Sequence, residues 1–366
     1  MDVGFTEDQL QFRDVVSRFL TDKSPPAAVR TLMETAEGYD PEVWQQLSQE
    51  VGLLGTHIPE QYGGFGFGLV ELGLIAQEMG RHLYCGPFFS SAVMAANAIL
   101  LMADEVHKQA LLPSLAAGTS IACLVLDSLA SPEELGEQLQ VQDGHLSGQA
   151  ELVVDVQAAD TLIVLAGGQD GLALFAVTPD QAEVTPLQSM DATRKLARVA
   201  FTRVPVQALG QAEPGQVELL WDQMATMLAH EMIGGAEHLF ESTIDYMKIR
   251  VQFGRTIGSF QALKHRCADL MLELELAKAM THAAGRFLAG GEGDVYSPNM
   301  AKALASEAYL SVAKQAIQLR GGIGFTWEED THLWFKRAKS SEVFLGTAGW
   351  HRERMIQRLE EENAHV

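Results

Sequence analysis

The residues best suited to chemistry lie between Gln318 and Arg354. The run that begins at Gln318 contains the pair Gly321-Gly322. It predicts a long helix that stops at the glycines, a tight turn, and a second helix that carries cations. Glycine lets backbone approach a ligand closely, and nearby Arg and Lys side chains supply charge for an anion such as a pyrophosphate. The alternative is a glycine C-cap followed by a solvated basic helix.

A second cluster of polar residues resembles a metal site but has the wrong spacing. His230 and Glu231 would begin a His-Glu-x-x-His zinc motif, but Gly234 occupies the place of the second histidine. We therefore predict no metal site. The methionine-rich face of the same predicted helix is interpreted as packing; it consists of Met224, Met227 and Met232.

Length and charge limit the class of protein. The chain has 366 residues, enough for a large core and two or three domains, and its hydrophobic content of 47% is typical of a globular protein. A formal net charge of −22 argues against nucleic-acid binding, because phosphate backbones need clustered cations. An acidic exterior is typical of a metabolic protein.

The expected compartment is the cytoplasm. The three cysteines, Cys85, Cys123 and Cys267, are far apart in the sequence and lack metal-ligand spacing, so we expect reduced and mostly buried thiols. The first residues are acidic where a targeting peptide would be basic. The longest apolar segment, residues 92–103, is shorter than the ~20 residues that a membrane span needs.

The elements that must position the candidate residues form three parts. Residues 5–20 form a helix that opens with a Thr6/Gln9 capping box, and further helices are expected at about 41–51, 69–82, 88–102 and 104–112. A turn-rich loop covers residues 59–66. The first domain, assigned to residues 1–116, is therefore predicted to be helical, with its last helix ending near Pro113.

The sequence period then changes from helix to strand and back. Asp143-Gly144 predicts a hairpin turn between strands at 138–141 and 145–154. Ser297 and Pro298 are expected as N-cap and first residue of a helix that runs to Arg320. The middle domain is assigned to residues 117–209 and the helical C-terminal domain to 210–366. The other expected elements are strands at 120–127, 161–166, 172–177, 183–187 and 197–203, a linker at 205–215, and helices at 220–250 and 260–288.

Two segments together resemble the acyl-CoA dehydrogenase family. The first, Tyr246 to His265, contains the family's Arg-x-x-Phe-Gly run and Phe-Gln pair, and the second is the Gln-x-x-Gly-Gly-x-Gly-Phe run about sixty residues later. The resemblance implies an α+β fold with an N-terminal helical domain, a middle β-barrel-like domain and a C-terminal four-helix bundle. It also implies FAD as cofactor and α,β-dehydrogenation of an acyl-CoA thioester.

The catalytic base of that family is missing from this chain. Most members carry a glutamate just before a Gly-Thr pair, where this chain has Leu345; others carry it at a position that matches Met224, followed by an arginine that matches Ala225. Neither Leu nor Met can accept a proton. Asp222 and Glu231 are the nearby carboxylates that could substitute, and we assign no catalytic residue.

The middle domain also departs from the family. Where members carry a Trp-Ile-Thr strand against the flavin ring, this chain has the run 148–154, Gly-Gln-Ala-Glu-Leu-Val-Val. The family's Gly-Ser-Asp cofactor loop is absent after Leu126-Asp127-Ser128. We therefore expect no complete flavin-ring pocket in this subunit.

The residues that the family extends across a subunit interface to a neighbour's FAD are retained. The resemblance therefore implies a non-catalytic subunit, paired with a paralogous acyl-CoA dehydrogenase chain in a heterotetramer, with electron-transfer flavoprotein as a further partner. Related split enzymes act on steroid side chains. The alternatives are a self-sufficient homo-oligomer with a relocated base and a non-enzymatic scaffold or acyl-CoA binding protein. The expected cofactor-binding residues are Arg250, Gln252, Phe253, Phe260, Gln261, Gln318, Gly321, Gly322 and Thr347.

Overall fold

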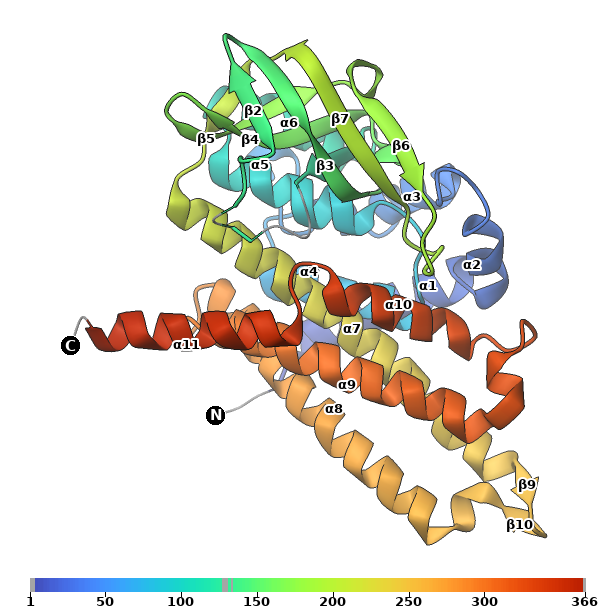
Figure 1. The fold of residues 1–366 in the computed structure, drawn as a ribbon. Coiled ribbons are helices and arrows are strands. Elements are labelled where there is room, and N and C mark those ends of the chain that lie inside the picture. The colour runs from blue at the N-terminus through green and yellow to red at the C-terminus, as the bar shows by residue number, and fades with distance from the viewer. Residues whose placement is uncertain (1–3, 127–130, 133, 365–366) are drawn as a thin grey trace. The chain divides into compact units, whose positions relative to one another are not determined.

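The computed structural model describes residues 4–126, 131–132 and 134–364, and the fold is shown in Figure 1. Contacts divide the chain into two compact units. The first comprises Met1–Pro26, Gly73–Tyr84 and Ala225–Val366, and the second comprises Ala27–Leu72 and Cys85–Met224. The loop after Leu126, where the Gly-Ser-Asp run was sought, lies outside the described residues.

The first unit is a helical bundle built on three long helices, α7 (Pro214–Ile249), α8 (Gln261–Leu288) and α9 (Ser297–Arg320) (Figure 1). The N-terminal end of α7 belongs to the second unit. The shorter helices α10 (Thr331–Val343) and α11 (Ala348–Ala364) follow. The unit also contains α1 (Glu7–Lys23), whose Thr6/Gln9 capping box is confirmed, and part of α4 (Leu69–Arg81).

Glycines let α4 and α7 touch along their backbones. A Cβ at Gly80 would lie 1.8 Å from the carbonyl oxygen of Glu231, and one at Gly234 would lie 1.7 Å from that of Gln77. Both distances are far inside van der Waals contact, so only glycine allows this crossing. Gly234, which breaks the zinc motif in the sequence, is therefore a packing residue.

Buried polar side chains in the same unit form a connected network. The side-chain amide of Gln77 lies 3.1 Å from His282 Nε2 and donates to Glu237 at 2.7 Å, and Glu237 in turn pairs with Lys278. Burial and the Lys278 charge lower the pKa of His282 to about 3, so this imidazole is neutral in the folded state. The network therefore binds α4, α7 and α8 together without a buried imidazolium.

The second unit combines short helices with one mixed sheet. Its helices are α2 (Pro26–Leu32), α3 (Pro41–Gln49), α5 (Ala96–Met102) and α6 (Glu105–Ala116), with 3₁₀ turns η1 (Leu53–Gly55) and η2 (Glu60–Tyr62) and the π-helical η3 (Phe88–Ala95). Every residue of η3 is buried. The Tyr62 hydroxyl donates to Glu105 at 2.7 Å, which fixes the turn-rich loop against α6.

The sheet has the order β6-β7-β3-β2-β4-β5-β8, with β1 paired parallel to β4. Asp143 and Gly144 both have positive φ and join β2 to β3, so the predicted hairpin turn is confirmed. The sheet core is mainly aliphatic, with Phe175 and Phe201. The strands are β1 (Ala122–Val125), β2 (Leu139–Gln142), β3 (His145–Val154), β4 (Thr161–Gly168), β5 (Gly171–Val177), β6 (Glu183–Leu187), β7 (Leu196–Pro205) and β8 (Ala208–Gln211).

The structure corrects four local predictions. Helix α6 continues through Pro113 to Ala116 instead of ending near Pro113. Ser297 is the first residue of α9, and Tyr296 is the N-cap. Helix α2 was not expected, and strand β8 lies inside the predicted linker. All four corrections concern short segments or element ends, where local sequence signals are weakest.

The architecture agrees with the predicted α+β class: an N-terminal helical part, a middle sheet and a C-terminal helical part. Cys85, Cys123 and Cys267 are free and buried, as expected. Among the described residues, no helix is both long and apolar enough to cross a membrane.

Candidate functional site

The end of the helical bundle carries most of the predicted cofactor residues. Helix α7 ends at Ile249 and leads through Arg250 into a two-stranded hairpin, β9 (Val251–Gln252) and β10 (Arg255–Thr256). Arg250 is exposed, and its carbonyl accepts from Ile257 N at 2.8 Å, which closes the base of the hairpin. The hairpin therefore presents the Arg250 guanidinium to solvent on a fixed turn.

Phe253 lies at the tip of this hairpin and is 92% exposed. Its φ of 54° is in the left-handed region, next to Gly254 with φ of 79°. An aromatic ring so exposed gains nothing from this chain's own core and is typical of a contact with another molecule. Phe260 lies behind it with its ring centroid 6.2 Å away, and the guanidinium of Arg255 lies 4.0 Å above the Phe260 ring.

A small apolar cluster fixes the hairpin and the ends of α8 and α9 against α7. Met247, Ile257 and Cys267 are its buried members, and Tyr246 and Leu319 pack on its edge. Because Leu319 follows Gln318 directly, the cluster brings the glutamine-glycine run to the same end of the bundle as the hairpin. The predicted residues Gln252, Gln261 and Gln318 are all exposed there.

Arg320 is a buried cation at this end that sequence reasoning did not select. Its guanidinium donates to Thr243 at 2.7 Å, to Ser242 at 3.1 Å and to Glu329 at 2.9 Å. Burial would raise the pKa of Glu329, but hydrogen bonds from Thr331 and the Arg320 charge outweigh it and lower that pKa. Arg320 thus locks the last turn of α9 to α7. The sequence pattern that could have identified Arg320 is a cation in the last turn of a helix, directly before a glycine pair.

The glycine pair itself is an open backbone surface. Gly321 caps α9 with φ of 66° and ψ of −143°, which a side chain would strain. No described atom lies within 4 Å of a Cβ built at Gly321 or at Gly322. The chain then forms the 3₁₀ turn η7 (Gly321–Phe325), whose Phe325 is 78% exposed. A ligand can therefore approach this backbone directly.

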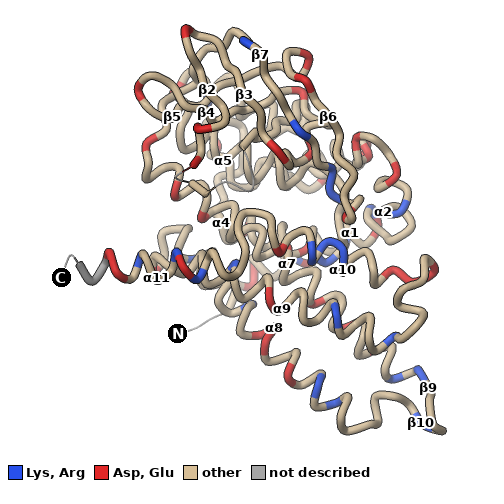
Figure 2. Tube along the Cα trace, viewed as in Figure 1, with Lys and Arg blue, Asp and Glu red and all other residues tan. Residues whose placement is uncertain are grey.

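Charge at this end favours an anion. Lys and Arg residues occur at the end of α7 and the start of α8, although the chain as a whole has a net charge of −22 (Figure 2). They include Arg250, Arg255, Lys264 and Arg266, all exposed. Cations, exposed aromatic rings and bare glycine backbone together fit the diphosphate and base of a dinucleotide.

Thr347, the remaining predicted residue, lies in a different place. The turn that contains it is held against the N-terminal half of α9 by Lys302, which is fully buried. The ammonium group donates to the carbonyls of Ser341 and Gly346, each at 3.1 Å. On α9, Lys302 and Gln318 are separated by roughly 24 Å at the helical rise. One copy of the chain therefore cannot bring Thr347 and Gln318 to the same atoms.

A buried histidine completes the support of this turn. His351 lies 2.9 Å from the Leu345 carbonyl through Nε2 and 3.0 Å from the Asn299 amide through Nδ1. Burial lowers the pKa of His351 well below its usual range, and the Lys302 charge acts in the same direction. A neutral ring carries one N–H, and the Leu345 carbonyl opposite Nε2 accepts it, so Nδ1 must accept a hydrogen bond. The Asn299 oxygen that faces Nδ1 cannot donate, so we assign the flipped amide, whose nitrogen otherwise lacks a partner among the described residues, as the donor.

The two base positions of the family are apolar and buried here. Leu345 is fully buried with φ of 57°, and Met224 is fully buried. Ala225, which matches the family arginine, is also buried. Asp222 is buried at 9% exposure. Leu345, Met224 and Ala225 therefore supply no proton acceptor, and Asp222 is the one carboxylate among these four residues.

Glu231, the other candidate base, is a partner in an ion pair. Its carboxylate accepts from the Arg337 guanidinium at 3.0 Å, and both side chains are at most 7% exposed. This carboxylate is therefore already engaged by a buried guanidinium on α10. The geometry therefore favours a structural role for Glu231 over a catalytic one.

The run that matches the family's flavin-ring strand lies in β3. Gly148 has φ of 127°, and a Cβ there would lie 1.9 Å from the carbonyl oxygen of Gln138. Leu152 also has positive φ, at an irregularity in the β3–β7 register. The side chains of this run are aliphatic or exposed, apart from Glu151, which pairs with Arg198 at 2.5 Å. The run therefore presents no ring or hydroxyl donor comparable to the Trp-Ile-Thr strand.

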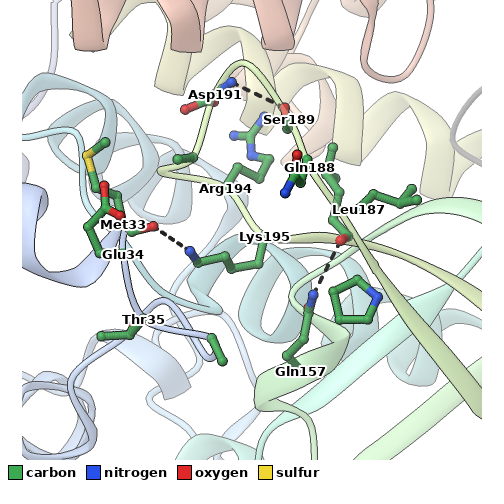
Figure 3. A pocket seen from close by; sticks show the side chains of 14 residues that line it. Met33, Glu34, Thr35, Gln157, Leu187, Gln188, Ser189, Asp191, Arg194 and Lys195 are labelled. Atoms are coloured by element: carbon green, nitrogen blue, oxygen red, sulfur yellow. Dashed lines mark hydrogen bonds between the residues drawn. The ribbon is translucent and has the colours of Figure 1, made fainter.

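A separate cavity of about 480 Å³ lies in the second unit between the end of α2 and the β6–β7 loop (Figure 3). The Lys195 ammonium donates to the Met33 carbonyl at 2.7 Å across one side of it. Its lining carries Arg194 and Lys195 but also Glu34 and Asp191. With balanced charge, the cavity has no electrostatic preference for an anion. Sequence reasoning did not predict it.

No group of three or more potential metal ligands occurs in the described part of the chain.

Comparison with known proteins establishes the class. The acyl-CoA dehydrogenase C-terminal domain model matches residues 220–360 and the N-terminal domain model matches residues 6–119. The chain belongs to the acyl-CoA dehydrogenase family.

Among relatives, acyl-CoA dehydrogenase IpdE2 of Mycobacterium tuberculosis is 35% identical over 361 residues, which cover 97% of each chain. Two solved structures have TM-scores of 0.88. The Tcur3481-Tcur3483 steroid acyl-CoA dehydrogenase variant is 28% identical and covers 98% of this chain and 99% of that chain. The ChsE4-ChsE5 complex from M. tuberculosis is 26% identical and covers 99% of each.

Proposed function

We propose that this chain is the non-catalytic subunit of a heteromeric, FAD-dependent acyl-CoA dehydrogenase. One contrast carries the proposal. Most of the residues that match those binding a neighbour's cofactor in the family, including Arg250, Phe253 and Gln318, are exposed at one end of the bundle. The base positions Leu345 and Met224 are instead buried and apolar. A chain that keeps only the exposed set supports a partner that carries out the chemistry.

Family membership makes FAD the cofactor, and its isoalloxazine supplies hydride acceptance when bound. In this chain, Arg250 would bind the pyrophosphate through its guanidinium, and the backbone at Gly321 and Gly322 would pack against the dinucleotide without steric hindrance. Gln318 would hydrogen-bond the nucleotide. The α proton of the acyl-CoA would go to a glutamate of the partner chain, because both base positions of the family, Leu345 and Met224, are apolar in this chain.

Names of the relatives support the partner and the substrate class. Two structural neighbours are two-chain assemblies, Tcur3481-Tcur3483 and ChsE4-ChsE5, and the first is described as a steroid enzyme. We propose by analogy a paralogous partner in a heterotetramer and a bulky acyl-CoA substrate of the steroid side-chain type. Electron-transfer flavoprotein is the proposed electron acceptor. The cytoplasm is the proposed location, in keeping with three free cysteines.

The test is co-expression with a paralogue that carries a glutamate at a base position. The complex should hold fewer FAD molecules than chains, measured by flavin absorbance against protein mass. Arg250→Gln should weaken FAD binding about tenfold to a hundredfold, the loss of one charge-assisted contact. Arg18→Gln, at an exposed arginine on α1, is the matched control and should leave FAD content unchanged.

Two outcomes would reject the proposal. A homo-oligomer of this chain alone that is fully loaded with FAD and reduces an electron-accepting dye would establish a self-sufficient enzyme. A purified complex that lacks flavin altogether, with added FAD not retained, would establish a scaffold or acyl-CoA binding protein.

A further inference from the structure

Helix α8 has two apolar faces, and only one is used inside the bundle. Leu270 and Leu274 are buried, whereas Leu272 is 63% exposed and Leu276 is 57% exposed. Ala268 and Ala279 are exposed in line with these leucines, at helical spacings of three and four residues. We call Ala268, Leu272, Leu276 and Ala279 the outer stripe. A stripe of this length on the solvent side of a long helix is typical of a helix–helix contact with another chain.

Carboxylates lie along the edges of the outer stripe. At 100° per residue, Asp269 and Glu273 lie about 60° and 100° to one side of Leu272, and Glu275 lies about 60° to the other side. Neither Asp269 nor Glu273 has an ion-pair partner among the residues that the structure describes. Glu275 is 4.0 Å from Lys278, which is itself held by Glu237 at 2.5 Å. No ion pair within the described part of the chain therefore engages the acidic edge of Asp269 and Glu273.

This arrangement disfavours pairing of α8 with a second copy of itself. Consider an antiparallel pair of α8 helices that buries Leu272 and Leu276 of both copies. Its twofold axis is perpendicular to the plane of the two helices, so the same edge of each copy lies on the same side of that plane. The Asp269 and Glu273 carboxylates of both copies would then lie along one edge of the pair. Four like charges at the rim of an apolar contact repel one another, an effect that screening by salt reduces.

We propose that the outer stripe binds a helix of a different chain, whose apolar residues are flanked by Lys or Arg, and that Asp269 and Glu273 exclude a second copy of this chain. The proposal rests on the heteromeric function argued above and adds the chemistry of the partner surface. Edge charges that attract one partner and repel another are an established way to set pairing between helices.

The test uses a charge-reversed form of this same chain as the probe. In Asp269→Lys/Glu273→Lys the acidic edge becomes basic while the outer stripe is unchanged. Wild type and this variant, mixed at low salt, should form a complex heavier than either protein alone, measured by light scattering after size exclusion. The dissociation constant of the mixed pair should be at least about tenfold below that of either chain with itself, and high salt should reduce the difference.

A second variant tests whether the stripe is the contact. Leu272→Asp in both proteins should abolish the mixed complex, whereas Val106→Asp, at a valine that is 75% exposed on α6, should leave it intact. Both positions are exposed, so the variants should fold, and far-UV circular dichroism checks this.

Two results would overturn the proposal: a mixture no heavier than its components, or a wild-type protein that alone loses mass on Leu272→Asp. Neither result depends on FAD content or dehydrogenase activity. Failure of this inference is therefore distinguishable from failure of the proposed function.

Discussion

The Glu231–Arg337 pair gives the sharpest prediction, because it separates a structural carboxylate from a catalytic one. The change is Glu231→Gln, which keeps the shape of the side chain and removes its charge. The guanidinium of Arg337, 3.0 Å away and 5% exposed, would then lose the charge of this partner. Removing one partner of a buried ion pair costs about 3–5 kcal/mol.

The glutamine oxygen still accepts a hydrogen bond from Arg337, so the lower end of that range applies. We expect the free energy of unfolding to fall by about 3 kcal/mol, measured by urea denaturation. The double variant Glu231→Met/Arg337→Met should recover most of the loss, because it removes both buried charges together. The matched control is Glu342→Gln, whose partner Lys339 is 49% exposed; it should cost less than about 1 kcal/mol.

Activity of the co-expressed complex is the second readout. If the reasoning is right, Glu231→Gln affects turnover only through the amount of folded complex. A variant as stable as wild type whose turnover at saturating substrate falls about a hundredfold would identify Glu231 as the base and refute the structural interpretation.

Two further predictions concern the same unit. Lys302→Met should lower the free energy of unfolding by about 3 kcal/mol, because it leaves the buried carbonyls of the Thr347 turn without this donor. Lys314→Met, at an exposed position of α9, is the control and should change the free energy of unfolding by less than about 0.5 kcal/mol. The pKa of His282 is lowered to about 3 in the fold, so from pH 6.5 downwards only the unfolded state takes up this proton. Stability should therefore fall as pH drops from about 6 towards 4, with a slope of about 1.4 kcal/mol per pH unit from this residue, which His282→Gln removes.

The sequence predicts those elements whose signals are local. The Thr6/Gln9 capping box and the Asp143-Gly144 turn are such cases, because each needs only a few adjacent residues. Helix α2 was missed because it is one short segment with no sustained period. The π-helical turns of η3 could not be predicted from the sequence. All residues of η3 are buried, so the segment lacks the regular alternation of apolar and polar residues that indicates a helical period.

The residues of the candidate site could be predicted from the sequence, but the side chains with which they interact could not. Arg250, Phe253 and Gln318 could be selected from motifs, and the structure places all of them exposed at one end of the bundle. The partner of Glu231 is 106 residues away in the sequence, so no local pattern could show that this carboxylate is already engaged. Arg320 was missed for the same reason, since its acceptors Ser242 and Thr243 are on α7.

The turn at Leu345 has a consequence for how such a subunit can arise. Lys302 and His351 hydrogen-bond main-chain oxygens of this turn, so these bonds do not require any particular side chain at position 345. Exchange of an acid for leucine there would leave these main-chain hydrogen bonds in place. Loss of chemistry at this position would then leave folding and assembly intact, which is the condition under which a duplicated gene can persist as a dedicated helper of its active sibling.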